Sequence, residues 1–408
     1  MAAMLSAVAP DVRLLFSARV ARMFSYGFLS VVLVLYLAAL GFGPGRIGLL
    51  LTLTLAGDTL VSLAMTLHAD RLGRRRMLVL GGLLMVGAGL PFLLSRDFAV
   101  LVVAATLGVI SPSGNEVGPF LAIEQAALAQ VLPEDRRTGA FAWYHLAGAF
   151  ATACGALAGG WAAQALQARG MAPVASYRVL VAAYAAAGFL LAALFARVSP
   201  GVEPPAPARA GRFGLHGSGP VVARLSALFA LDAFAGGFVV QSLVAWWFHQ
   251  RHGLDPGGLG TLFFGANLLA GLSALYAVRL AKRIGLLRTM VFTHIPSNLL
   301  LMLVPFMPGL LPAAAVLLLR FSISQMDVPA RQAYTLAVVA PEERSAAAGI
   351  TGIARTTGAA LAPVLAGPLL AAPALAGGIF LLAGGLKLVY DLLLFAAFRT
   401  SGGAADRA

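Results

Sequence analysis

Two long apolar runs, roughly residues 47–67 and 77–94, are separated by one short basic turn, Ala69-Asp70-Arg71-Leu72-Gly73-Arg74-Arg75-Arg76. Because about 20 apolar residues of helix cross a bilayer core, each run is long enough to span a membrane. A connection this short allows only a tight antiparallel hairpin of two helices. The arginines indicate that the turn is cytoplasmic, since cytoplasmic loops of membrane proteins carry an excess of Lys and Arg.

The composition excludes a soluble globule. The chain has 408 residues, is 60% hydrophobic and only 11% charged, and has a mean hydropathy of +0.88, whereas about 25% of residues are charged in soluble domains. The net charge of +13 would ordinarily suggest nucleic acid as a partner. Its distribution follows the loops between apolar segments, so no nucleic-acid partner is expected, and the charge instead favours contact with anionic membrane lipid.

Apolar segments that predict transmembrane helices recur along the whole chain, at about residues 12–40, 46–68, 76–94, 98–131, 138–165, 177–197, 222–249, 256–280, 288–306, 310–340, 345–372 and 376–398. With the N-terminus inside, 18 of the 29 lysines and arginines fall on the cytoplasmic side, and 5 fall on the outer side, namely Arg46, Arg96, Arg169, Arg178 and Arg251. This bias predicts a multi-pass protein of the cell (inner) membrane with both termini cytoplasmic.

The basic turn resembles the signature loop of the major facilitator superfamily of transporters. The resemblance rests on the pattern Asp-Arg-x-Gly-Arg-Arg between the second and third segments, carried by Asp70, Arg71, Gly73, Arg74 and Arg75. It implies an all-α membrane protein of twelve transmembrane helices that binds a small-molecule or ion substrate, expected as a monomer. It also implies that Asp70 is a latch, placed against the start of the eleventh segment to hold the cytoplasmic side closed.

An internal repeat agrees with the architecture that this resemblance implies, two pseudo-symmetric six-helix halves. The stretch 41–50 aligns without gaps to 253–262, and Pro-Glu-Asp-Arg at 133–136 matches Pro-Glu-Glu-Arg at 341–344. The expected organisation is a first half at 12–198, a flexible cytoplasmic linker at 199–220, a second half at 221–398 and a disordered tail at 399–408.

Charged side chains inside the predicted helices are candidates for function, because an ionisable group in a membrane is costly unless it is paired or faces water. Aligning Phe24-x-x-Gly27-Phe28 with Phe234-x-x-Gly237-Phe238 places Arg22 opposite Asp232. In the superfamily, the first, fourth, seventh and tenth helices line the central cavity, so these two charges are predicted to pair across it or to be packed statically. Arg19 shares the face of Arg22, and Asp58 is an alternative partner for Arg22.

The fourth and tenth segments each carry an acid close to a proline. Glu116 precedes Pro119 by three residues, and Asp327 precedes Pro329 by two. Proline loosens a helix, which suits a moving, cavity-lining element. Neither Glu116 nor Glu124 has a basic partner nearby in sequence, so Glu116 is the leading candidate for a proton carrier and Glu124 the second. Asp327 is a third candidate, or it forms a structural i, i+4 pair with Arg331.

Other polar residues inside the segments complete the predicted cavity, and these are Asn115, Gln241, Arg320, Gln325, Arg331 and Arg355. Lys387 and Asp391 are expected to form a structural i, i+4 pair. In the fifth segment, Gly155-Ala-Leu-Ala-Gly159-Gly160 is similar to a glycine motif of antiporter helices in the superfamily, which indicates export.

Metal-ligand spacing, phosphate-binding loops and nucleophile motifs are absent from the sequence, so no cofactor, no metal and no enzymatic activity are expected. The predicted function is secondary active transport by alternating access, with protons exchanged for a small solute that is exported. Uptake by symport or uniport is the alternative. A membrane sensor or assembly protein that does not transport is the remote one.

Overall fold

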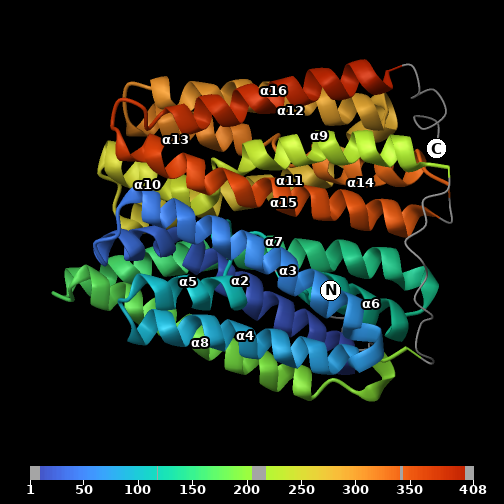
Figure 1. The fold of residues 1–408 in the computed structure, drawn as a ribbon, viewed down its shortest axis with the longest axis horizontal. Helices are drawn as coiled ribbons and strands as arrows, with labels where there is room; N and C mark the ends of the chain where they lie inside the picture. The colour runs from blue at the N-terminus through green and yellow to red at the C-terminus, as the bar shows by residue number, and fades with distance from the viewer. Residues whose placement is uncertain (1–9, 117, 205–216, 341–342, 400–408) are drawn as a thin grey trace. The chain divides into compact units, whose positions relative to one another are not determined.

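The computed structural model describes residues 10–116, 118–204, 217–340 and 343–399. All regular secondary structure in these ranges is helical (Figure 1). The predicted tail lies outside the described residues except for Arg399, and so does the middle of the predicted linker. The elements run in the order α2 (Pro10–Ala39), α3 (Pro44–Leu72), α4 (Arg74–Leu94), α5 (Phe98–Leu107), α6 (Phe120–Val131), α7 (Glu134–Ala168), α8 (Pro173–Ala196), η1 (Pro200–Val202), α9 (Gly219–Gly237), α10 (Gln241–His252), α11 (Pro256–Ile284), α12 (Leu286–Leu303), η2 (Val304–Phe306), α13 (Leu310–Phe321), α14 (Asp327–Ala337), α15 (Arg344–Ala371) and α16 (Gly378–Phe398).

These helices confirm the predicted fold class. In the described part of the chain, 10 spans are long and apolar enough to cross a membrane, and one of them, Gly219–His252, consists of α9 and α10 together. The two remaining predicted segments are each built from a pair of helices, α5 with α6 and α13 with α14. Counted in this way, the helices of the described residues form twelve membrane segments.

Three segments predicted as continuous are broken, and the breaks fall in the fourth, seventh and tenth segments. The longest break separates α5 from α6. Gly114 and Gly118 adopt φ of 68° and 81° there, values that a helix of L-residues does not accommodate. Pro119 is therefore the cap of α6, and the prediction of one continuous helix over 98–131, loosened at Pro119, is wrong. Shorter breaks separate α9 from α10 and α13 from α14.

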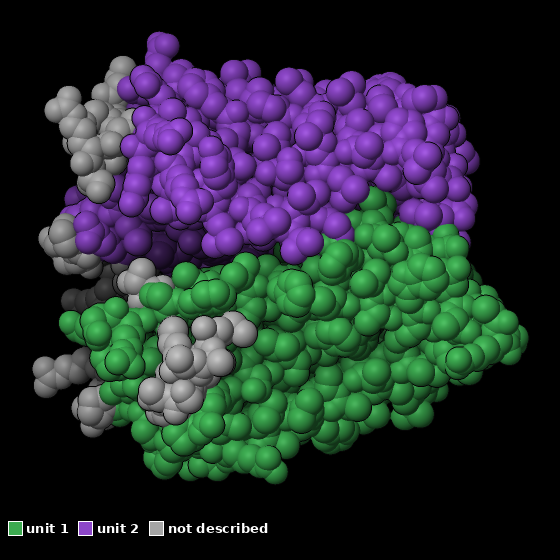
Figure 2. Space-filling model, turned by 180° about the vertical axis from the view of Figure 1, so that it is seen from behind, with its two compact units in different colours: residues 1–42, 56–210, 255–264 green, residues 43–55, 211–254, 265–408 purple. Residues whose placement is uncertain are grey.

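The chain forms two compact units, shown in green and purple in Figure 2. Unit 1 comprises residues 1–42, 56–210 and 255–264, and unit 2 comprises residues 43–55, 211–254 and 265–408. The segment 43–55 begins α3 and belongs to unit 2, whereas 255–264 begins α11 and belongs to unit 1. These two segments occupy equivalent positions in the internal repeat.

Glycine contacts of the same kind hold equivalent helices together inside each unit. In unit 1, a methyl group added to Gly27 of α2 would lie 2.1 Å from the carbonyl oxygen of Thr152 in α7. In unit 2, one added to Gly237 of α9 would lie 2.5 Å from the carbonyl oxygen of Ala359 in α15. Small residues let helix backbones approach closely in membranes, where dispersion and polar contacts replace the hydrophobic effect as the cause of association.

Candidate functional site

Unit 1 holds a buried cluster of charges around Arg22, which is 0% exposed in the middle of α2. Its guanidinium donates through Nη1 and Nη2 to the two carboxylate oxygens of Glu124, at 2.6 and 2.7 Å. Its Nη2 also lies 2.9 Å from Oε1 of Glu116. The bidentate geometry with Glu124 fixes the orientation of the guanidinium plane, so Arg22 joins α2, α6 and the α5–α6 break.

Arg19, one helical turn before Arg22, extends the cluster towards α7. It forms an ion pair with Glu116, donates from Nε to the backbone oxygen of Tyr144 at 2.9 Å, and lies over the Tyr144 ring at 4.6 Å from its centroid. The Tyr144 hydroxyl donates in turn to Glu124. Two arginines and two glutamates thus balance one another, and the tyrosine supplies a further hydrogen bond.

The expectation that Glu116 and Glu124 are unpaired carboxylates is wrong. Sequence separations of about a hundred residues hide their arginine partners, because pairing occurs between helices and not along one of them. The two acids nevertheless differ in access, since the Glu116 side chain is 17% exposed and that of Glu124 is 0% exposed. Glu116 is consequently the more accessible acid of this cluster.

Asp58 of α3 is not a partner of Arg22. It accepts a hydrogen bond from the backbone N–H of Gly118 at 2.6 Å and lies 3.4 Å from the Ser62 hydroxyl. Asp58 therefore holds the irregular backbone that carries Glu116. Asn115, in the same break, is exposed, and its carbonyl accepts from the Ser111 hydroxyl at 2.8 Å.

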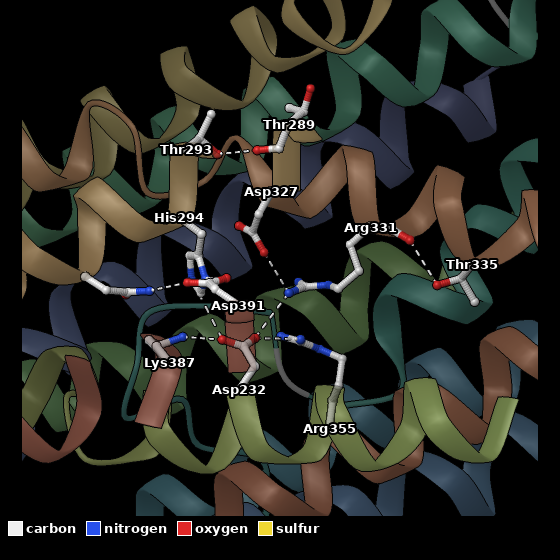
Figure 3. Close-up of polar contacts among 11 residues, drawn as sticks. Asp232, Thr289, Thr293, His294, Asp327, Arg331, Thr335, Arg355, Lys387 and Asp391 are labelled. Atoms are coloured by element: carbon white, nitrogen blue, oxygen red, sulfur yellow. Dashed lines mark hydrogen bonds and ion pairs between the residues drawn. The ribbon is translucent and has the colours of Figure 1, made fainter. Parts of the chain in front are cut away.

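Unit 2 holds a second network, centred on Asp232 of α9 (Figure 3). Its Oδ1 accepts from Nζ of Lys387 at 2.5 Å, and its Oδ2 accepts from Arg331 at 3.2 Å and from Arg355 at 3.0 Å. Arg331 also donates to Asp327 at 2.8 Å, so the i, i+4 pair expected in α14 is present. Asp232 is 3% exposed, and three cations from α14, α15 and α16 offset the cost of burying its charge.

The predicted pair of Lys387 with Asp391 is wrong. Lys387 is bound to Asp232, and Asp391 instead contacts His294 at 2.9 Å and the Asn298 amide at 3.0 Å. Within a helix, a base that precedes an acid at i, i+4 is the less favourable order, and contacts with other helices prevail here.

The remaining predicted cavity residues differ in exposure and in their contacts. Arg355 is the accessible member of the unit 2 network, with 31% of its side chain exposed. Arg320 lies 4.8 Å from the centroid of the Phe321 ring, and its buried Nε has no hydrogen-bond partner among the described residues. Gln241 accepts from Asn267 at 3.2 Å, and Gln325 is half-buried in the break between α13 and α14.

The predicted gating loop is tied to the end of unit 1. Arg74 donates from Nε to Asp70 at 2.7 Å and from Nη1 to the carbonyl of Val202 at 3.0 Å. Glu203 accepts from the backbone N–H groups of Arg74 and Arg75, at 2.7 and 3.1 Å. Gly73 has φ of 102°, which ends α3 and allows α4 to begin. Arg71 is exposed in the last turn of α3.

Sequence reasoning missed Tyr144, His294, Asn298 and Glu203 as members of these clusters. His294 and Asn298 are polar residues inside a predicted membrane segment, at i, i+4 on one helix face, and that pattern was the available signal. Tyr144 and Glu203 carried none, because a single aromatic residue or a loop acid is common in any membrane protein.

The comparisons with known proteins identify the family. The family model described as Major Facilitator Superfamily matches residues 15–324. The chain therefore belongs to the Major Facilitator Superfamily, which confirms the resemblance drawn from the basic turn. It is a multi-pass membrane protein with the fold of a transporter.

Individual relatives cover nearly the whole chain. "Uncharacterized membrane protein YJR124C" of Saccharomyces cerevisiae is 29% identical over 422 residues, covering 95% of this chain and 94% of that protein. A bacterial homologue of the human lysosomal transporter Spinster, in an inward-facing and occupied conformation, superposes with a TM-score of 0.73 at 16% identity, covering 95% of this chain and 96% of that one. A D-xylose–proton symporter superposes with a TM-score of 0.72 at 13% identity, covering 94% and 97%. At these identities, the two solved structures establish the fold.

Proposed function

We propose that this protein is a proton-coupled secondary transporter that exports a small solute by alternating access, with Glu116 as the proton carrier. The observation that carries the proposal is the position of Glu116 in the α5–α6 break. It is a partly exposed carboxylate joined to two buried arginines. A membrane acid with both access to water and a charged partner has two states that differ in energy, as coupling requires.

The local chemistry supports a switch at Glu116. When Glu116 is ionised, Arg19 and Arg22 each contact it, and the cluster is balanced. When it is protonated, Arg22 retains both contacts with Glu124, whereas Arg19 loses its carboxylate and keeps the backbone oxygen of Tyr144. Proton binding therefore changes the contacts of Arg19 more than those of Arg22. Arg19 is the group whose position would respond to protonation of Glu116 and so affect the solute.

The glycine motif of α7 is the feature that supports the direction of transport. The glycine motif in α7 resembles that of antiporters, and it packs tightly, since a methyl group on Gly155 would lie 2.0 Å from the carbonyl oxygen of Phe24. The protein would load a proton at Glu116 when open outward and release it inward in exchange for the solute. Symport is the second candidate, favoured by the shared fold with the D-xylose–proton symporter.

The decisive experiment uses purified protein in liposomes and a solute found by thermal-shift screening, because a ligand that binds the folded state stabilises it. Glu116→Gln imitates the protonated acid. It should abolish transport driven by a pH gradient while preserving solute binding and exchange between equal solute pools. Glu134→Gln, a matched change at an exposed acid of α7, should leave all three unchanged. If Glu116→Gln still accumulates solute under a pH gradient alone, Glu116 is not the carrier, and Glu124 and Asp327 become the candidates.

The same liposomes determine the direction. Antiport predicts that solute and protons cross the membrane in opposite directions, and symport predicts that they cross in the same direction. The orientation is tested separately in cells: a reporter fused after Arg399 should be cytoplasmic, and one inserted at Pro173 should be outside. An external reporter at Arg399 would contradict the proposed topology.

A further inference from the structure

In unit 2, His294 of α12 lies between two buried carboxylates from two other helices (Figure 3). Its Nδ1 is 2.9 Å from Oδ1 of Asp391 in α16, and its Nε2 is 3.8 Å from Oδ1 of Asp232 in α9. His294 is 5% exposed, Asp391 is 0% exposed and Asp232 is 3% exposed. All three groups are shielded from water, so their protons and charges must be balanced by protein contacts.

A neutral imidazole ring does not satisfy this position. Neutral histidine carries one N–H and one lone pair. If Nδ1 carries the hydrogen, it donates to Asp391, and the lone pair on Nε2 faces a carboxylate oxygen of Asp232. If Nε2 carries the hydrogen, the lone pair on Nδ1 faces Asp391 at 2.9 Å. Each tautomer leaves one ring lone pair near a negatively charged oxygen, at 3.8 Å from Asp232 or at 2.9 Å from Asp391, which is unfavourable in a buried setting.

One additional proton makes both contacts attractive. It can reside on the ring, whose Nδ1–H then donates to Asp391 and whose charged Nε2–H side lies 3.8 Å from Asp232. It can equally reside on Asp391, which then donates to Nδ1 while Nε2–H faces Asp232. From this geometry we propose that His294 and Asp391 form a proton-binding site in unit 2, separate from the Glu116 site of unit 1 and independent of it.

The two carboxylates around His294 have different surroundings. Asp232 is bound to Lys387, Arg331 and Arg355, whereas His294 is the only ion-pair partner of Asp391 among the described residues. The amide of Asn298, on the same face of α12, holds the other oxygen of Asp391 at 3.0 Å. Asp391 is therefore the carboxylate whose charge depends on the histidine, and the proton is retained or lost by this pair.

The site is connected to the charge network through one oxygen atom. Oδ1 of Asp232 is the atom that faces Nε2 of His294, and it is also the atom that accepts from Lys387. A proton on Nε2 consequently competes with Lys387 for the same acceptor. The titratable groups that contact His294 are Asp232 of α9 and Tyr390 and Asp391 of α16. The helices packed against α12 also carry Arg320 (α13), Asp327 and Arg331 (α14) and Lys387 (α16), and Arg355 of α15 binds Asp232.

The test observes the proton on the ring directly. Purified full-length protein labelled with ¹⁵N-histidine is titrated between about pH 5 and pH 9, the range in which histidine exchanges its proton, and the ring nitrogen signals are followed by NMR. The chain has 6 histidines, and loss of one signal set in His294→Gln assigns the site. If that variant does not fold, replacing the other histidines one at a time assigns His294 by elimination.

The expected result is a reversible change of the His294 signals within this range. Asp391→Asn, which removes the facing charge, should lower the proton affinity at least tenfold. Asp97→Asn, at the exposed start of α5, should not change it. His294 signals that stay constant over the whole range, whether neutral or charged, would overturn the proposal, and so would an unaltered titration in Asp391→Asn. Because the measurement needs no solute, it is independent of the Glu116 test, and the titration should persist in Glu116→Gln.

Discussion

The charge networks of the two units are built at equivalent positions with opposite signs. In unit 1 the central group is a cation, Arg22, which two carboxylates surround. In unit 2 the central group is an anion, Asp232, which three cations surround. The repeat that aligns Gly27 with Gly237 places Arg22 and Asp232 at the same position of equivalent helices.

The difference shows which features the repeat preserves. Packing is preserved, since both glycines contact a backbone carbonyl of the equivalent facing helix. The sign of the central charge is not preserved. Electrostatic balance allows the reversal, since it requires only that each buried charge lie near an opposite one. A pairing between Arg22 and Asp232 is therefore not required to neutralise either of them.

The largest expected effect comes from removing the two central charges. Asp232→Asn leaves Lys387, Arg331 and Arg355 without their shared acceptor and should cost about 3–5 kcal/mol, as does breaking a buried ion pair from one side. Arg22→Met should cost less at pH 4 than at pH 8, because Glu124, left without a cation, can bind a proton, whereas the arginines left behind in Asp232→Asn cannot release theirs. Melting temperatures of both variants in detergent, measured at pH 4 and pH 8, test these two expectations. Equal pH dependence in the two variants would show that the reversal of charge has no energetic consequence.

The packing equivalence predicts a smaller and symmetrical effect. Gly27→Ala and Gly237→Ala should each destabilise the protein by about 1–3 kcal/mol, since the added methyl group overlaps a backbone oxygen that cannot move alone. Gly385→Ala in α16 is the control, because nothing lies within 4 Å of its added methyl group. Thermal unfolding of the purified variants measures the effect. Destabilisation by only one of the two substitutions would show that the two glycine contacts are not equivalent.

Each unit also has a glutamate that binds backbone N–H groups at the start of a helix. Glu203 binds those of Arg74 and Arg75 in unit 1, and Glu343 binds those of Gly217 and Ser218 at 2.9 Å each in unit 2. Glu203→Gln and Glu343→Gln should each lower stability by about 0.5–2 kcal/mol, the usual value of a helix cap. Similar shifts in melting temperature would show that the helix ends of the two units are also equivalent. A shift in only one variant would show that they are not.

The smallest expected effect on stability is that of Asp70→Asn. The Asp70 side chain is 40% exposed and pairs with Arg74 across the turn that joins α3 to α4, and an exposed ion pair contributes about 0.2–1 kcal/mol. If Asp70 is a cytoplasmic latch, turnover should fall while the amount of folded protein stays the same. Solute flux into liposomes tests this, and unchanged kinetics would remove the latch from the mechanism.

Local reasoning from the sequence succeeded where one helix contains the whole interaction. The Asp327–Arg331 pair has the favourable order within α14 and is present. It failed where helices from distant parts of the chain compete. Lys387 was expected to bind a residue one turn away, but it binds Asp232, which lies 155 positions earlier. The breaks in the fourth, seventh and tenth segments were also missed. In the fourth segment, Ser-Pro-Ser-Gly-Asn at 111–115 and Gly-Pro at 118–119 are turn-forming residues, and Gly114 and Gly118 are not helical.

The sequence by itself determined the membrane segments, the family and the set of charges that lie inside the membrane. It could do so because a bilayer demands about 20 apolar residues per helix and makes every exception costly. Only the tertiary structure decided which charges are partners, which helices are broken and where His294 lies. Those outcomes depend on distances of a few ångströms between side chains on different helices, and electrostatic energy in a buried site changes steeply over such distances.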